Sequence, residues 1–79
     1  MKIKILYFGA IAEIMQKTAE ELEVGKKTYL YELKDKLESF NKKLKEMNFA
    51  LAVNQKMTQQ NIELQNGDEI AFFPPFAGG

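Results

Sequence analysis

The chain has 79 residues, of which 46% are hydrophobic, and its eleven lysines balance eleven acidic residues to give a formal net charge of zero. It contains no cysteine, histidine or arginine, which excludes a thiolate nucleophile, an imidazole base, a zinc site and a guanidinium clamp for phosphate. We therefore expect a protein that is not an enzyme by itself and that holds no metal or cofactor of its own.

The same features bear on domain number and location. This length predicts a single domain, residues 1–79, with a small core. The even charge balance argues against nucleic-acid binding, which usually needs an excess of basic residues. No segment approaches the roughly 20 apolar residues that cross a bilayer, and the apolar run near the N-terminus is interrupted by lysine, unlike a signal peptide. The sequence predicts a soluble cytoplasmic protein that binds neither nucleic acid nor a membrane.

Hydrophobic periodicity and turn residues divide the chain into predicted elements. In chain order these are a strand over residues 2–8, a short helix over 10–15, a strand over 18–24, a long helix from about residue 30, and strands over 49–53, 56–58 and 69–73. This order indicates an α+β domain with a mixed sheet of about five strands packed on one main helix. Because one helix covers only one face of a sheet, the other face should be polar or should meet a partner.

The first strand shows the clearest alternation. Lysines separate Ile3 from Ile5, which predicts that Ile3, Ile5 and Tyr7 face the core. Leu6 and Phe8 then point to the opposite face of the sheet.

The long helix is predicted from a stripe of apolar residues spaced 3, 4, 3 and 4 apart. The stripe consists of Leu30, Leu33, Leu37, Phe40 and Leu44. Thr28 is the expected N-cap. A coiled-coil seam is the competing interpretation, but the pattern lasts barely two heptads, so a core helix is favoured. Asn41 is a candidate interruption, which would leave residues 42–47 as a frayed extension or a separate turn.

The last strand predicts an exposed aromatic cluster. Ile70 and Phe72 are assigned to the core, so Phe73 points outward beside Phe8, and Phe76 lies beyond the sheet. Such a cluster is the pattern of a protein-binding patch. The alternative is that these aromatic rings fold back and fill gaps in a small core.

The C-terminal residues form a distinct segment. Pro74 and Pro75 cannot donate ladder hydrogen bonds, so they stop the sheet, and residues 74–79 are expected to project as a flexible tail. Gly78 and Gly79 have no Cβ, so their backbone fits a channel too narrow for side chains. A frayed terminus is the alternative. The terminal carboxylate suggests chemistry that needs no side chain: adenylation by ATP, followed by replacement of AMP with sulfur to give a thiocarboxylate.

Three segments of the sequence carry a resemblance to a known family. They are KILYF with AEI over residues 4–8 and 12–14, LAVNQ over 51–55, and LQNGDEIAFFPP over 64–75 leading to the final Gly-Gly. With these segments the chain resembles the small subunit of molybdopterin synthase, within the ubiquitin-like sulfur-carrier family. One departure is Ala12, where the family often has a basic residue.

The resemblance implies a ubiquitin-like β-grasp fold and a carrier cycle. A partner enzyme similar to those that activate ubiquitin would use ATP to adenylate Gly79, which then becomes a thiocarboxylate. The large subunit of molybdopterin synthase, in a heterotetramer, would receive the sulfur for cyclic pyranopterin monophosphate in molybdenum cofactor biosynthesis. Gly79 is then the reactive residue and Gly78 a steric requirement. The expected partner-binding residues are Phe8, Met57, Phe73, Pro74, Pro75 and Phe76.

Other functions remain as alternatives. A thiamine-pathway sulfur carrier shares the fold and the Gly-Gly end, although such chains tend to lack Phe-Pro-Pro before the glycines. A ubiquitin-like protein modifier would join Gly79 to lysines of other proteins. A different class of function is an inert β-grasp interaction module whose tail carries out no chemistry.

Overall fold

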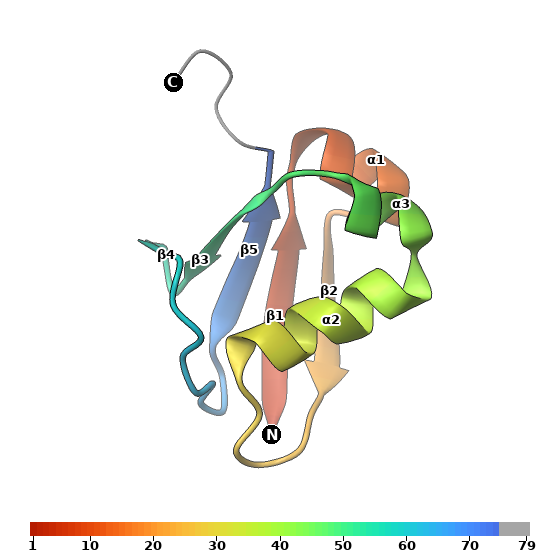
Figure 1. The fold of residues 1–79 in the computed structure, drawn as a ribbon. Helices are drawn as coiled ribbons and strands as arrows, with labels where there is room; N and C mark the ends of the chain where they lie inside the picture. The colour runs from red at the N-terminus through yellow and green to blue at the C-terminus, as the bar shows by residue number, and fades with distance from the viewer. Residues whose placement is uncertain (75–79) are drawn as a thin grey trace.

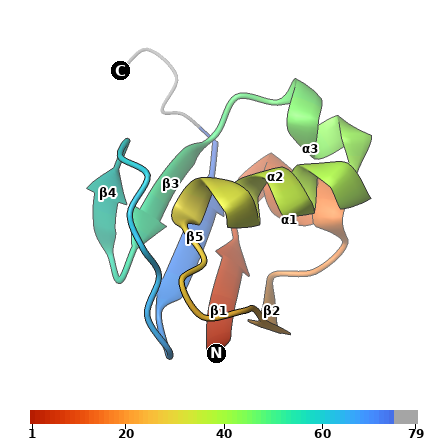
Figure 2. The same cartoon turned by 60° about the horizontal axis from the view of Figure 1, so that its bottom comes forward.

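A computed structural model describes residues 1–74, which form one mixed sheet with a long helix lying across one of its faces (Figures 1 and 2). In chain order the elements are β1 Lys2–Tyr7, α1 Gly9–Met15, β2 Ala19–Glu23, α2 Leu30–Phe40, α3 Lys42–Glu46, β3 Ala50–Val53, β4 Lys56–Thr58 and β5 Glu69–Phe73. The predicted order of strands and helices is confirmed, with α3 as an additional short helix. β3 begins one residue later than predicted.

The two central strands are β1 and β5. The strand order is β2-β1-β5-β3-β4, with β1 and β5 parallel and every other neighbouring pair antiparallel. The edges are taken by β2, which is acidic, and by β4, which has three residues. Charged or very short edge strands discourage pairing with other chains. The predicted sheet of five strands on one main helix is therefore confirmed.

The core lies between the sheet and α2. From the central strands, the side chains predicted to face inward are buried, with at most 1% of each exposed: Ile3, Ile5, Tyr7, Ile70 and Phe72. They meet the apolar side of α2, where Leu30, Leu33 and Leu37 are also buried. Complete burial of one such side chain stabilises the fold by about 1.5–3 kcal/mol, so this layer supplies the main driving force for folding.

The apolar stripe of the long helix is interrupted where the sequence allowed for it. Asn41 has extended backbone angles and ends α2, and its side-chain oxygen accepts a hydrogen bond from the N–H of Lys43 at 3.0 Å. Its amide nitrogen donates to the carbonyl of Ile14 at 3.1 Å. The chain changes direction at this break. As a result, Leu44 on α3 is buried while Phe40 at the end of α2 is 69% exposed. Residues Lys42–Glu46 are thus a separate short helix, neither a frayed extension nor a turn, and the prediction that Phe40 joins the core is wrong.

The N-terminus of α2 also differs from the prediction by one residue. Tyr29 is the N-cap, and its N–H donates to a carboxylate oxygen of Glu32 at 2.9 Å. The Thr28 hydroxyl instead donates to the carbonyl of Gly25 at 2.6 Å, inside the preceding turn. The predicted N-cap at Thr28 is therefore wrong, because its hydroxyl satisfies the turn rather than the helix.

A buried carboxylate joins the turns at one end of the sheet. Asp68 accepts hydrogen bonds from the side-chain amide of Asn54 at 2.9 Å and from the N–H of Gln65 at 2.7 Å. The Asn54 oxygen accepts from the N–H of Glu69 at 3.0 Å. Asn54 has a positive φ of 51° in the β3–β4 turn, which asparagine tolerates better than most residues. These bonds hold the β3–β4 turn against the start of β5.

A buried hydroxyl joins β1 to β2. Tyr7 donates a hydrogen bond to a carboxylate oxygen of Glu20 at 2.5 Å. Burial raises the pKa of Tyr7 far above its ordinary value, and the hydrogen bond and negative charge of Glu20 raise it further. Ionisation of Tyr7 is therefore strongly disfavoured in the folded state.

This burial predicts a loss of stability in alkali. Below the unfolded-state pKa of about 10, Tyr7 is protonated in both states and its stabilisation is complete. Above that pH the unfolded chain loses the proton and the folded chain keeps it. The free energy of unfolding should then fall by up to about 1.4 kcal/mol per pH unit more than in Tyr7→Phe. Urea denaturation from about pH 8 to about pH 11 measures this, with Tyr29→Phe at an exposed ring as the control. Parallel pH profiles for wild type and Tyr7→Phe would contradict the expectation.

Candidate partner-binding face and tail

The face of the sheet opposite α2 carries an apolar row that crosses four strands. The register places Leu6 of β1 beside Ala71 of β5, Ala71 beside Ala52 of β3, and Ala52 beside Met57 of β4. Leu6, Ala71 and Ala52 alternate with core residues along their strands, so they point away from the core, and pairing with Ala52 puts Met57 on the same face. The row is apolar throughout, but Ala52 in its middle is only 5% exposed, whereas Met57 at its edge is well exposed.

A second row lies nearer the end of β5. Ala50 is the neighbour of Phe73, and the rings of Phe73 and Phe8 meet edge to face with centroids 6.3 Å apart. Edge-to-face pairs of this kind are favourable for aromatic rings. We call the two rows together the open-face patch. It consists of Leu6, Phe8, Ala50, Ala52, Met57, Ala71 and Phe73.

The patch combines small and large side chains. Its alanines have one-carbon side chains, and its larger residues are Leu6, Phe8, Met57 and Phe73. Phe8 is 47% exposed and Met57 is 58% exposed. Large apolar side chains left this exposed on one face are typical of protein-binding surfaces.

The other end of the same face is charged. Lys4 lies between Glu21 of β2 and Glu69 of β5, and Lys2 lies beside Glu23. Opposite charges across neighbouring strands are favourable pairs. The open face thus changes from charged to apolar along β5, and the apolar part lies toward the end at which Pro74 follows the strand.

The structure brings together the predicted site residues that it describes. Phe8, Phe73 and Met57 share the open-face patch, and Pro74 follows Phe73 directly, half-buried. The sequence alone did not place Met57 on a face, whereas its pairing with Ala52 does. Their role in binding stays a prediction. The predicted residues Pro75, Phe76, Gly78 and Gly79 lie outside the described residues.

Sequence reasoning missed two of the three alanines of the patch. Ala71 alternates with Ile70 and Phe72, so its outward direction was readable from β5. Ala50 and Ala52 lie in a continuous apolar run, where no polar residue marks the alternation. Only the register with β5 assigns these two side chains to the open face.

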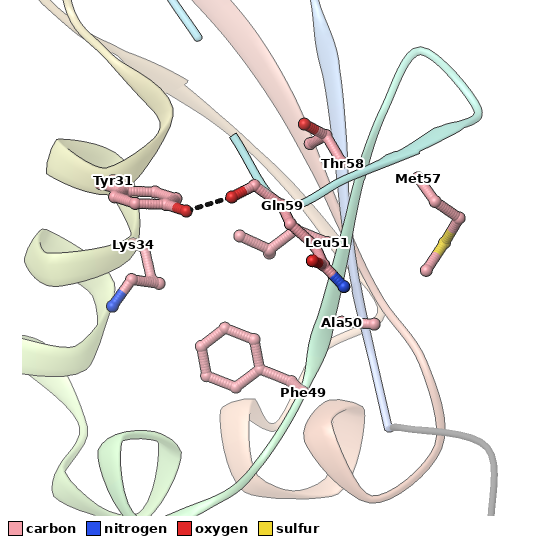
Figure 3. Close-up of a pocket in the computed structure, with 8 residues that line it drawn as sticks. All are labelled: Tyr31, Lys34, Phe49, Ala50, Leu51, Met57, Thr58 and Gln59. Carbon is pink, nitrogen blue, oxygen red and sulfur yellow. Dashed lines mark hydrogen bonds between the residues drawn. The ribbon is translucent and has the colours of Figure 1, made fainter. Parts of the chain in front are cut away.

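A separate groove lies between α2 and the β3–β4 hairpin (Figure 3). It has a volume of about 650 Å³, and the Tyr31 hydroxyl donates across it to the carbonyl of Gln59. Figure 3 shows Phe49 pointing into the groove, between Lys34 and the β3–β4 hairpin. Ala50 and Met57 line the groove as well, so it adjoins the open-face patch at this edge of the sheet.

The one lysine that lines this groove is already partnered. Lys34 lies 3.2 Å from Asp35 and 3.5 Å from Glu38, with its nitrogen 5.9 Å from the centre of the Tyr31 ring. Burial disfavours its charged form, but the two carboxylates outweigh burial and raise the pKa of Lys34 above its ordinary value. A lysine held in its charged form is a poor general base, so the groove offers no acid–base pair.

Residues 1–74 contain neither a cluster of metal ligands nor a helix that could span a membrane. No group of three or more aspartate or glutamate side chains in this part of the chain is arranged to hold a metal ion. No helix among these residues has the length and apolar character needed to span a membrane.

Comparison with known proteins identifies the family. A sequence model of the ThiS family matches residues 5–79. The chain belongs to the ThiS family. It is 38% identical to a molybdopterin synthase sulfur carrier subunit from Mycobacterium tuberculosis, covering 100% of this chain and 99% of the relative. It is 31% identical to the protein of the same name from Escherichia coli, covering 98% and 99%.

Solved structures show the same fold. A Pyrococcus furiosus chain superposes with a TM-score of 0.88 at 24% identity, covering 96% of this chain and 99% of that one. Urm1 from Trypanosoma brucei superposes with a TM-score of 0.76 at 18% identity, covering 99% and 95%. A chain in the complex of subunits 1 and 2 of molybdopterin-converting factor from Helicobacter pylori is 27% identical, with a TM-score of 0.73 and complete coverage of both chains. The predicted ubiquitin-like β-grasp fold is confirmed.

The exposure of the patch predicts how its residues affect stability. Met57→Lys and Phe40→Lys both alter exposed side chains, so each should change the free energy of unfolding by less than about 0.5 kcal/mol. Leu33→Ala removes a buried side chain and should lower it by about 2–5 kcal/mol. Chemical denaturation of the three variants makes the comparison. A loss for Met57→Lys as large as that for Leu33→Ala would assign Met57 to the core instead of the surface.

Proposed function

We propose that this chain is the sulfur-carrying subunit of molybdopterin synthase and that the carboxylate of Gly79 carries the sulfur. The observation that carries the proposal is the position of the patch in the chain. Phe73, on the outward side of β5, is followed directly by Pro74 and then by the segment that ends in Gly78-Gly79. Similarity along the whole chain to proteins named molybdopterin synthase sulfur carrier subunit supports the same function. The working group is then an end of the backbone rather than a side chain.

The proposed chemistry begins with activation of that carboxylate. A partner enzyme similar to those that activate ubiquitin joins a carboxylate oxygen of Gly79 to the α-phosphate of ATP and releases pyrophosphate. Sulfide from a donor protein attacks the acyl carbon, a carbon–sulfur bond forms, and AMP leaves with the oxygen. The resulting thiocarboxylate is an ionised nucleophile that needs no base from this chain. This fits a sequence without cysteine or histidine.

The second half of the proposed cycle takes place on the large subunit. The thiocarboxylate gives its sulfur to cyclic pyranopterin monophosphate, and water restores the carboxylate of Gly79. Two such transfers supply both sulfurs of the dithiolene that later binds the metal. We propose a heterotetramer with two small subunits flanking a dimer of large ones, acting in the cytoplasm. The Helicobacter pylori complex of subunits 1 and 2 supports a large-subunit partner.

Both proposed partners must reach the same chain end. The open-face patch lies beside Pro74, where the last described residues leave the sheet, and it exposes Phe8 and Met57. A partner that covers the patch holds the chain a few residues from Gly79. We therefore propose that the activating enzyme and the large subunit both bind the open-face patch, and that they do so in turn because one surface cannot hold both.

The first test of the function is the chemical state of Gly79. Mass spectrometry of the protein incubated with the activating enzyme, ATP and a sulfide donor should find the mass change of one oxygen replaced by sulfur, located in the C-terminal peptide. Deleting Gly79 should abolish pterin sulfuration while thermal denaturation stays as in the wild type, because the last strand ends at Phe73, well before this residue in the sequence. Sulfur transfer by the shortened chain would overturn the mechanism. Conjugates on lysines of other proteins would indicate a protein modifier instead.

The second test is the binding surface. Met57→Lys places a charge within the proposed contact, where it loses water without gaining a partner, so affinity for the large subunit should fall at least about tenfold. Phe40→Lys is the matched control, because Phe40 is also exposed but lies on α2, and its affinity should be unchanged. Titration calorimetry measures both. Equal affinities for Met57→Lys and wild type would remove the open-face patch from the interface.

A further inference from the structure

Gly9 is the first residue of α1, directly after the N-cap Phe8, and it lies against the last described residue, Pro74. A Cβ atom built on Gly9 would be 3.0 Å from Cγ of Pro74 and 3.4 Å from its Cδ. Carbon atoms in favourable contact are about 3.5–4.0 Å apart, so any side chain at Gly9 would push the proline ring by a few tenths of an ångström. The missing Cβ is what permits this close approach.

The backbone around Gly9 is firmly held. The N–H of Phe8 donates to the carbonyl of Phe72 at 3.0 Å, which extends the pairing of β1 with β5. The carbonyl of Phe8 accepts from the N–H groups of Ile11 and Ala12 at 3.1 and 3.4 Å, and Ile11 is fully buried. These hydrogen bonds hold the residue before Gly9 in place on both β5 and α1, so a shift of Gly9 away from Pro74 would strain them.

Pro74 is the residue through which the sheet is joined to the C-terminal segment. Proline has a fixed φ and no N–H, so it cannot be held by a further ladder hydrogen bond of its own. The close approach of its ring to Gly9 is a contact that a side chain at position 9 would disturb. Because Pro74 is the last described residue, the position of this ring marks the point at which the chain leaves the sheet.

We propose that Gly9 is a positioning residue for Pro74, because the absence of its side chain lets the Pro74 ring lie against the start of α1 and so fixes the point at which the chain leaves the sheet on the way to Gly79. The effect on sulfur loading rests on the function proposed above. The effect on Pro74 itself does not depend on that function.

Glycine at this position can be explained in two ways, by the lack of room for a side chain beside Pro74 or by the positive φ of the backbone. A control variant must distinguish the two. Gly9 has a φ of +57°, a conformation that strains residues with a side chain. Gly67 has a φ of +87°, but a Cβ atom added to it would meet no atom within 4 Å. The two glycines share the conformational requirement and differ in their neighbours, so Gly67→Ala is a matched control for strain without contact.

The first experiment measures the contact directly. In the wild type, nuclear Overhauser effects should join the α-protons of Gly9 to the γ- and δ-protons of Pro74. In Gly9→Ala the Pro74 carbon resonances should shift, and in Gly67→Ala they should not. Both variants should lower Tm by about 5 °C. Absence of the Gly9–Pro74 effects in the wild type, or equal Pro74 spectra in the two variants, would overturn the inference whatever the protein does.

The second experiment measures the consequence for activation. With the activating enzyme and ATP, Gly9→Ala should lower kcat for adenylate formation about tenfold, since a reacting group is displaced, while KM changes less than about twofold because the open-face patch is intact. Gly67→Ala should leave both within about twofold. Gly9→Asn, whose side chain tolerates a positive φ, should lose kcat as Gly9→Ala does but retain more thermal stability.

A double substitution decides between contact and strain. In a Pro74→Ala background the ring is gone, so adding Gly9→Ala should lower kcat less than about twofold further. The same tenfold loss in both backgrounds would assign the effect to backbone strain and overturn the positioning role. If the wild type itself is not adenylated, the proposed function fails, and the resonance measurements still decide whether Gly9 positions Pro74.

Discussion

The parallel pairing of β1 with β5 is the constraint on which the rest of the structure depends. Its register sets Tyr7 beside Phe72 in the core and, one residue further along, brings Phe8 to Phe73 on the other face. Parallel neighbours cannot be joined by a tight turn and need a long connection. In this chain that connection carries α2, which lies back across the sheet and covers the core side (Figure 1). One pairing therefore fixes the core and the position of the chain end together.

The two faces of the sheet follow from the same alternation but have different surroundings. A chain of this length has one long helix, and that helix covers one face. The uncovered face is charged near Lys4, and water solvates this part well. Near Phe73 and Met57 the face is apolar, and water solvates it poorly. A small domain buries only a modest share of its surface in any case. Because the fold is small, an apolar region stays uncovered beside the point where the C-terminal segment leaves the sheet. A partner protein can bind to this region.

The division of chemistry between this chain and its proposed partners follows from composition. Activation, sulfur delivery and pterin binding would all need groups that this sequence does not have, since it contains no cysteine, histidine or arginine. The contribution of this chain is to position the carboxylate. It does so with a sheet, with a binding surface next to the end of that sheet, and with the close approach of Pro74 to Gly9 at the start of the first helix. A carrier of this kind acts through the position of one carboxylate. The contacts that matter most for its function are therefore those at the end of β5.

Features that depend on local backbone geometry were readable from the sequence. Alternation in the first and last strands predicted which of their side chains are buried, and the chemistry proposed for the Gly-Gly end stays a prediction from the sequence. Tertiary structure decided what depends on contacts between distant segments. Phe40 leaves the core because Asn41 bonds to a different helix, and Met57 joins the patch only through its register with β3. The approach of Gly9 to Pro74 joins residues far apart in the chain, and no local pattern encodes such a distance.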